Sequence, residues 1–274
     1  IVFKTVRMSM GEGNAPASAQ CYAAFGVILC GMTEAVKLAW DFGKLGIRLA
    51  ERPESEAYRA RTLYVANYFI RPWRAPLRES IEPLARASRL GVELDDLLYA
   101  SYAAFGEVFL TFLDGRELGE AARRIEGVAE VAERRGQTNI VHLIRSLHQA
   151  VLNLMGEAAN PRRLTGRAFD VERMLPALVA ANDRTAVFRV HFHQMVLAYL
   201  FEDFPAAESE ADAAEAYLDG VIATPMVPLY YFYDGLVRLA VGATSRSPLA
   251  AAERMDRAAA AAERLRVWAR SSPE

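Results

Sequence analysis

The sequence is poor in the residues that build disulfide frameworks and metal centres. Its 274 residues include 2 cysteines, 4 histidines and 3 tryptophans. Cys21 and Cys30 fall on one expected helix about 13 Å apart, which is beyond disulfide reach. We therefore expect two inert thiols in a reducing cytoplasm, and a cytoplasmic location for the chain.

The chain also lacks an excess of either charge. It has 32 Lys and Arg against 34 Asp and Glu, a net charge of −2. Nucleic-acid binders usually carry a clustered positive excess, so we expect no nucleic-acid partner. Residues 13–33 carry no charge, but only Cys21 to Met32 is continuously apolar. A membrane span needs about twenty apolar residues, so we expect neither a span nor a signal peptide.

Alanine, in contrast, is abundant. The chain has 48 alanines, and 53% of its residues are hydrophobic. Alanine has the highest intrinsic helix propensity, so the composition favours an all-α fold with a sizeable core. Apolar residues recur at helical spacing, as in the stripe Ile140, Leu143, Ile144, Leu147, Val151, Leu154 and Met155. Thr33 is expected to cap the N-terminus of a helix.

Breakers divide these stripes into paired helices. We expect twelve helices, near residues 16–30, 33–51, 55–71, 76–91, 94–113, 116–135, 137–155, 170–181, 183–201, 204–222, 226–242 and 247–270. The turns inside successive pairs lie 41 to 47 residues apart, at Gly31, Arg74, Gly115, Arg162, Asp203 and Thr244. A two-helix unit of about forty residues predicts a superhelical stack of about six antiparallel helix hairpins, a tetratricopeptide-like solenoid. An irregular helical bundle is the alternative.

Two further expectations belong to this fold. Glycines inside helices, at Gly43, Gly46, Gly106 and Gly235, are expected to let neighbouring helices approach closely. Residues 1–274 are expected to form a single helical-repeat domain, cut from a longer multidomain protein because the chain starts at Ile1 and ends in a polar tail.

Catalytic and cofactor motifs are missing. There is no phosphate-binding GxxxxGK[ST] loop, no HExxH and no GxSxG, and neither His142 and His148 nor His191 and His193 are spaced to share a helix face. We therefore expect no cofactor, no metal and no enzymatic activity. The acidic cluster at residues 208–215 is interpreted as a solvated helix start, where carboxylates favour the positive end of the helix dipole.

Aromatic and polar residues are concentrated on the first helices of the expected hairpins. In stacked hairpins those helices line the concave surface, where aromatic and Arg side chains could bind a peptide, a domain or a small ligand. The alternative is that most are core residues with a hydrogen-bonded polar end. The candidate contacts are Asn67, Arg71, Trp73, Tyr99, Tyr102, Arg145, Gln149, Asn153, Tyr230 and Asp234.

Short motifs spread over the chain resemble a known helical region. They are residues 14–19 (NAPASA), 28–31 (ILCG), 67–73 (NYFIRPW), 149–154 (QAVLNL), 181–186 (ANDRTA), 217–220 (YLDG) and 232–236 (FYDGL). They resemble the segment between the AAA/STAND-type ATPase and the GAF domain of large bacterial signalling proteins, which also carry a serine/threonine kinase-like domain and a sensor histidine kinase. The resemblance implies a fragment with none of those enzymatic domains, acting as a sensor or inhibitory arm.

Three functions are compatible with these observations. The first is a non-catalytic scaffold or regulatory module that contacts the neighbouring ATPase, GAF or kinase domains or a signalling partner. The second is a sensor that binds a small molecule or peptide in the groove near Asn67, Arg71, Tyr102, Arg145, Gln149 and Asn153. The third, an enzyme built on a helical bundle, is the least favoured because no catalytic constellation is visible.

Overall fold

The computed structural model describes residues 1–33 and 35–272, and within these ranges the chain contains α-helices and no β-strand. The predicted all-α fold is therefore confirmed. The chain divides into two compact units. Unit 1 comprises residues 1–116, 223–225 and 269–274, and unit 2 comprises residues 117–222 and 226–268. The single domain expected from the sequence stays a prediction.

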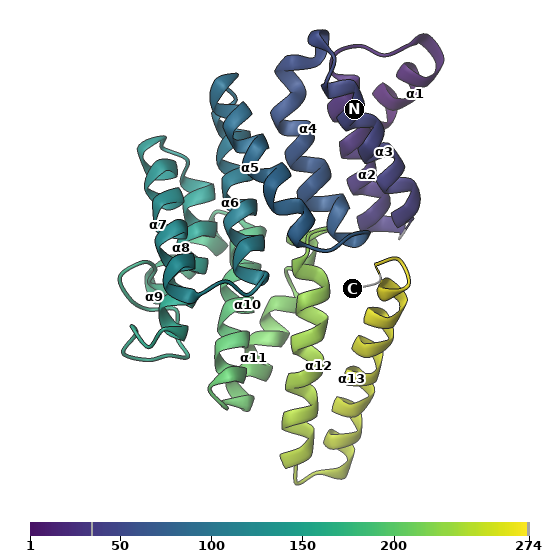
Figure 1. Ribbon diagram of the computed structural model, residues 1–274. Coiled ribbons are helices and arrows are strands. Elements are labelled where there is room, and N and C mark those ends of the chain that lie inside the picture. The colour runs from purple at the N-terminus through teal and green to yellow at the C-terminus, as the bar shows by residue number, and fades with distance from the viewer. Residues whose placement is uncertain (34, 273–274) are drawn as a thin grey trace. The chain divides into compact units, whose positions relative to one another are not determined.

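Unit 1 is built from antiparallel helix pairs (Figure 1). Its α-helices are α1 (Val2–Glu12), α2 (Ser18–Thr33), α3 (Val36–Ala50), α4 (Arg59–Val65), α5 (Arg78–Glu93) and α6 (Leu97–Leu113). A 3-10 turn, Pro53–Tyr58, precedes α4. The π-helical turn Ala66–Ile70 and the 3-10 turn Arg71–Trp73 follow α4, so the helix expected over 55–71 is divided into segments of different pitch.

The close approach of α2 and α3 depends on glycine. A Cβ atom added to Gly46 would lie 2.7 Å from the backbone oxygen of Ala19 on α2. The expected role of a small residue at Gly46 is thus confirmed, because backbone cannot move aside as a flexible side chain can. At Gly235 a Cβ would meet Ala261 at 3.7 Å, an ordinary contact, so glycine is not required there.

Two local expectations in unit 1 were wrong. Helix α1 was not expected, although it packs on α2 through Phe3 and Phe25, whose ring centres are 5.4 Å apart. Thr33 is the last residue of α2, and its hydroxyl donates to the carbonyl of Leu29 at 2.8 Å. It therefore bonds backward into its own helix instead of capping the next one.

Unit 2 contains seven of the described α-helices, and the bounds of six of them lie within two residues of the sequence expectations. The helix expected over 204–222 ends at Glu215 instead, and a separate 3-10 turn, Leu218–Val221, follows it. They are α7 (Leu118–Arg134), α8 (Thr138–Leu154), α9 (Val171–Ala180), α10 (Arg184–Leu200), α11 (Phe204–Glu215), α12 (Met226–Thr244) and α13 (Pro248–Ala269). Asp170, Asp183 and Asp203 accept backbone N–H bonds at the starts of α9, α10 and α11. These aspartates end each preceding connection and set where the next helix begins.

Helices α12 and α13 form the last hairpin of unit 2 (Figure 1). The side chains of Tyr231 and Trp268 pack edge to face with ring centres 5.5 Å apart. In the described part of the chain, no helix is both long enough and apolar enough to cross a membrane.

Candidate ligand pocket

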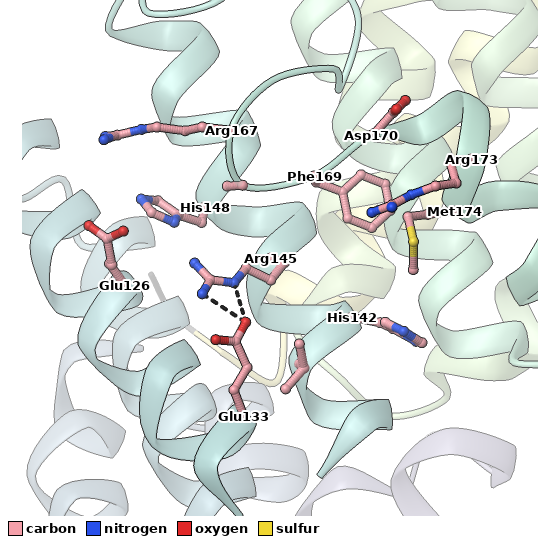
Figure 2. A pocket seen from close by; sticks show the side chains of 12 residues that line it. Glu126, Glu133, His142, Arg145, His148, Arg167, Phe169, Asp170, Arg173 and Met174 are labelled. Atoms are coloured by element: carbon pink, nitrogen blue, oxygen red, sulfur yellow. Dashed lines mark hydrogen bonds and ion pairs between the residues drawn. The ribbon is translucent and has the colours of Figure 1, made fainter. Parts of the chain in front are cut away.

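A hollow of about 480 Å³ opens in unit 2 beside α8 (Figure 2). A long connection, residues 155–170, forms one of its walls between α8 and α9. The volume lies within the range of about 300–1,000 Å³ that is usual for small-ligand sites. The lining residues come from α7, α8, the connection and α9: Glu126, Glu133, Val141, His142, Arg145, His148, Arg167, Ala168, Phe169, Asp170, Arg173 and Met174.

Two buried amides of α8 hold the connection against the helix. Asn153 donates from Nδ2 to the carbonyls of Arg163 at 2.6 Å and Pro161 at 3.0 Å. Gln149 donates to Asn153 Oδ1 at 2.8 Å, and its Oε1 accepts the N–H of Ala168 at 3.0 Å. Buried amides that satisfy otherwise unpaired backbone groups stabilise an irregular segment.

Gln149 and Asn153 were candidate contacts with a ligand or partner. The structure shows both side chains buried and bonded within the chain. They shape the pocket by holding the backbone that carries Arg167 and Phe169, and neither lines it.

Arg145, in contrast, does line the pocket. Its Nε and Nη2 bind the same oxygen of Glu133 at 2.8 and 2.7 Å, and the guanidinium lies below His148 in Figure 2. Arg167 extends above His148 from the connection and pairs with Glu157 at 3.1 Å. Two cations of the pocket thus lie on either side of one imidazole.

His148 is the most unusual group of the pocket. Its side chain is 1% exposed, and no group of the described residues bonds either ring nitrogen. Burial lowers the pKa of the imidazole below its ordinary value, so the ring is neutral at pH 7. A neutral imidazole carries one donor and one acceptor, and leaving a buried polar group unbonded costs about 1–3 kcal/mol.

The spacing of His142 and His148 predicts that they do not share a helix face. The structure brings both His142 and His148 to the pocket wall, at its two ends (Figure 2). Their spacing of six residues gives no signal for this, because it does not show which residues of α7, the connection and α9 face α8. Glu126, Arg167 and Phe169 were missed for the same reason.

Five further candidate contacts belong to unit 1, where they bond or pack against neighbouring residues of that unit. Asn67 donates to the carbonyl of Leu63 at 2.8 Å, inside the π-helical turn. Arg71 binds Glu79 at 2.7 Å, and Trp73 Nε1 donates to the carbonyl of Ala223 at 2.8 Å. Tyr99 and Tyr102 each pack on Tyr64, with ring centres 6.1 and 5.7 Å away. For Asn67 and Trp73, which are buried, these contacts fit the alternative of core residues with bonded polar ends.

Tyr230 and Asp234, on α12, face the interior of unit 2. Tyr230 donates to the carbonyl of Ala211 at 3.1 Å, and Asp234 accepts from Arg238 Nε at 2.9 Å. Arg238 is 3% exposed and also binds Glu208 at 2.9 Å and Asp212 at 2.5 Å. The interpretation of residues 208–215 as a solvated helix start was wrong, because α11 begins at Phe204 and these carboxylates bind Arg and His side chains.

Neither a metal-binding cluster nor a comparison with known proteins points to another site. Within residues 1–33 and 35–272, no three His, Cys, Asp or Glu side chains are grouped so that they could hold a metal ion. The chain matches no protein-family model, and the comparison with curated proteins finds no match either. The pocket of unit 2 and the exposed surfaces of the helices therefore carry the functional argument.

Proposed function

We propose that the chain is a non-catalytic helical-repeat module that makes protein contacts, within its parent polypeptide or with a signalling partner in the cytoplasm. The resemblance of its short motifs to the region between an AAA/STAND ATPase and a GAF domain suggests those domains, or an associated kinase, as the partner. On this proposal the module regulates a signalling ATPase or kinase and binds no nucleic acid.

The arrangement of α12 carries this proposal. The helix buries the charged Asp234 and Arg238 in its packed face. Phe232 and Leu239, on another face, are 48% and 43% exposed. Charged side chains are seldom fully buried, and exposed apolar surface that is continuous along an element marks an interaction site.

The exposed apolar residues of α12 follow helical spacing. Phe232 and Leu239 are exposed and Leu236 between them is half-buried; the three lie four and three residues apart, so they fall on one face of the helix. We call this face the α12 stripe. A protein surface that covered it would remove apolar area from water without disturbing the buried charges.

Site-specific photo-crosslinking in the full-length parent polypeptide tests the proposal. A photoreactive residue at Leu239 is expected to crosslink to one identifiable segment of an ATPase, GAF or kinase domain. The same residue at Arg123, which is exposed on α7, is the control and is expected to give no such product. Phe232→Ser is expected to reduce the Leu239 crosslink severalfold. Equal crosslinking from both positions, or none from Leu239, would contradict the proposal.

A second candidate function is a small-molecule sensor, and the pocket of unit 2 favours it. Of the groove residues expected from the sequence, only Arg145 lines this pocket. A thermal-shift screen of the chain against a metabolite library tests the sensor function. A ligand whose stabilisation is lost in Arg145→Met supports it, and a library without any stabilising compound counts against it.

A further inference from the structure

The charged side chains around His148 differ in whether they form ion pairs within the protein. Arg145 and Arg167 form ion pairs with Glu133 and Glu157, so neither pairs with Glu126. The Glu126 carboxylate instead lies beside His148 on the wall formed by α7 (Figure 2). A ligand that approached His148 would therefore meet a carboxylate from α7 and two guanidinium groups, one from α8 and one from the connection.

A simple anion does not match this arrangement. Arginine binds carboxylates well through its planar fork of N–H donors, but Glu126 would repel the same anion. A ligand with a carboxylate and an ammonium group only a few atoms apart satisfies both charges. The neutral ring of His148 can add one donated and one accepted hydrogen bond to it.

The remaining walls are partly apolar. Phe169 of the connection, Met174 of α9 and Val141 of α8 line the pocket. These side chains can cover an aliphatic or aromatic group of moderate size, as the apolar walls of small-ligand sites usually do. The polar end and the apolar end together specify one class of molecule.

We propose that this pocket binds a free amino acid with an apolar side chain. Arg145 and Arg167 hold its carboxylate, Glu126 holds its ammonium group, and His148 bonds the polar end between them. The side chain packs against Phe169 and Met174. This inference names the ligand class of the sensor function and rests on it, whereas the contacts of the α12 stripe are independent of it.

Calorimetric titration of the whole chain with three related compounds tests the inference. L-Leucine carries both charges, N-acetyl-L-leucine lacks the ammonium group, and L-leucinamide lacks the carboxylate. We expect leucine to bind at least about tenfold more tightly than either analogue. In ¹⁵N spectra of histidine side chains, leucine is expected to shift the ring signals of His148.

Two charge variants assign the two ends of the ligand. Glu126→Gln is expected to abolish the preference for leucine over N-acetyl-leucine, and Arg167→Gln the preference for leucine over leucinamide. Both residues are outside the packed core, so the variants should fold. Arg123→Gln on α7 removes a surface charge outside the pocket and is expected to change neither preference.

The possible failures are distinguishable. No binding of leucine at millimolar concentration, or equal binding of all three compounds, overturns the inference. If the library screen then finds a ligand of another class that depends on Arg145, the sensor function stands and only the amino acid is wrong. If neither experiment finds a ligand, both the sensor function and the amino-acid inference are wrong. The crosslinking test of the α12 stripe does not depend on either.

Discussion

At the scale of single residues, burial decides whether a titratable side chain of this protein is charged. His193, on α10, is buried, and within the part of the chain that the structure describes no group bonds either of its ring nitrogens. Burial, and secondarily the nearby charge of Arg189, lowers the pKa of its imidazole to about 3. The folded chain thus keeps His193 neutral at pH values where the unfolded chain protonates it.

This difference predicts a loss of stability in acid. Above pH 6.5, the ordinary pKa, His193 is neutral in both states and does not change the free energy of unfolding. As the pH drops from 6.5 toward about 3, only the unfolded chain binds the proton, so the free energy of unfolding falls. The slope approaches about 1.4 kcal/mol per pH unit. We expect His193→Leu to flatten the dependence of the free energy of unfolding on pH between 6.5 and 4, measured by urea denaturation.

The neighbouring Phe192→Leu provides the control. It removes apolar volume from the same helix without removing a titrating group, so it should lower stability by a similar amount at every pH. An unchanged pH slope in His193→Leu would contradict the claim that His193 causes the loss of stability in acid.

A second prediction at this scale concerns Gly166, in the connection before α9. A Cβ atom at this position would lie 2.5 Å from Nε2 of Gln149, whose amide is held by Asn153 and by the backbone of the connection. We expect Gly166→Ala to destabilise the chain by about 1–3 kcal/mol, because the amide must give up bonds to make room.

The matched control is Gly127→Ala in α7. Apart from its chain neighbours and the nearby backbone of its own helix, a Cβ at Gly127 would meet no described atom within 4 Å, so alanine there should stabilise the helix by about 0.5–1 kcal/mol. Thermal unfolding of the two variants separates the roles of the two glycines. Equal effects of the same sign would show that the packing of Gly166 on Gln149 is unimportant.

At the scale of elements, α12 illustrates how a charged network can hold helices together. Arg238 joins Asp234 of its own helix to Glu208 and Asp212 of α11, and Arg254 of α13 binds Glu208 at 2.7 Å. Hydrogen bonding by Arg254 lowers the pKa of Glu208, so the part of the stability that Glu208 supplies is present above pH 4.5 and lost as the pH falls.

Removing the central arginine should be costly. Arg238→Met leaves the buried Asp234 without its ion pair to Arg238, and we expect a loss of about 3–5 kcal/mol in the free energy of unfolding. Arg257→Met serves as the control, since Arg257 is 40% exposed, binds Asp212 and Glu215, and approaches Asp234 only to 3.8 Å. That variant should cost about 0–1 kcal/mol. Urea denaturation at pH 7 measures both, and similar losses would contradict the central position of Arg238.

The elements that sequence predicted well are those with a regular apolar period. The stripe from Ile140 to Met155 gave α8 to within about two residues, and Asp183 and Asp203 mark real helix starts. The π-helical turn Ala66–Ile70 was missed because it changes the pitch of a helix without changing its composition. Helix α1 was missed because its only buried residues are Val6 and Ser9, too few for a visible stripe.

The candidate pocket could not be predicted for a different physical reason. Gln149 and Asn153 were noticed as polar residues on a helix face, but their bonding partners are backbone atoms of the connection, whose fold has no periodic signal. Arg167 to Asp170 of that segment complete the wall of a pocket that His148 also lines. Sequence spacing describes positions along one helix, whereas this site depends on an irregular segment.

On the scale of the whole molecule, the division into two compact units makes a prediction about cooperativity. Contacts concentrated within units lead to local unfolding of one unit at a time, which hydrogen exchange can detect. Gly46 of unit 1 and Gly220 of unit 2 are suitable probes. A Cβ would lie 2.7 Å from the oxygen of Ala19 at Gly46, and 2.8 Å from the carbonyl carbon of Arg184 at Gly220.

We expect Gly46→Ala to accelerate amide exchange in α2 and α3 and to leave the amides of α10 and α11 unchanged. Gly220→Ala is expected to do the reverse, because the clash lies between Gly220 and the start of α10. Mass spectrometry of peptides after exchange measures both. If either substitution accelerated exchange throughout residues 1–272, the chain would unfold as one cooperative domain, as the sequence suggested, and the two units would have no separate stability.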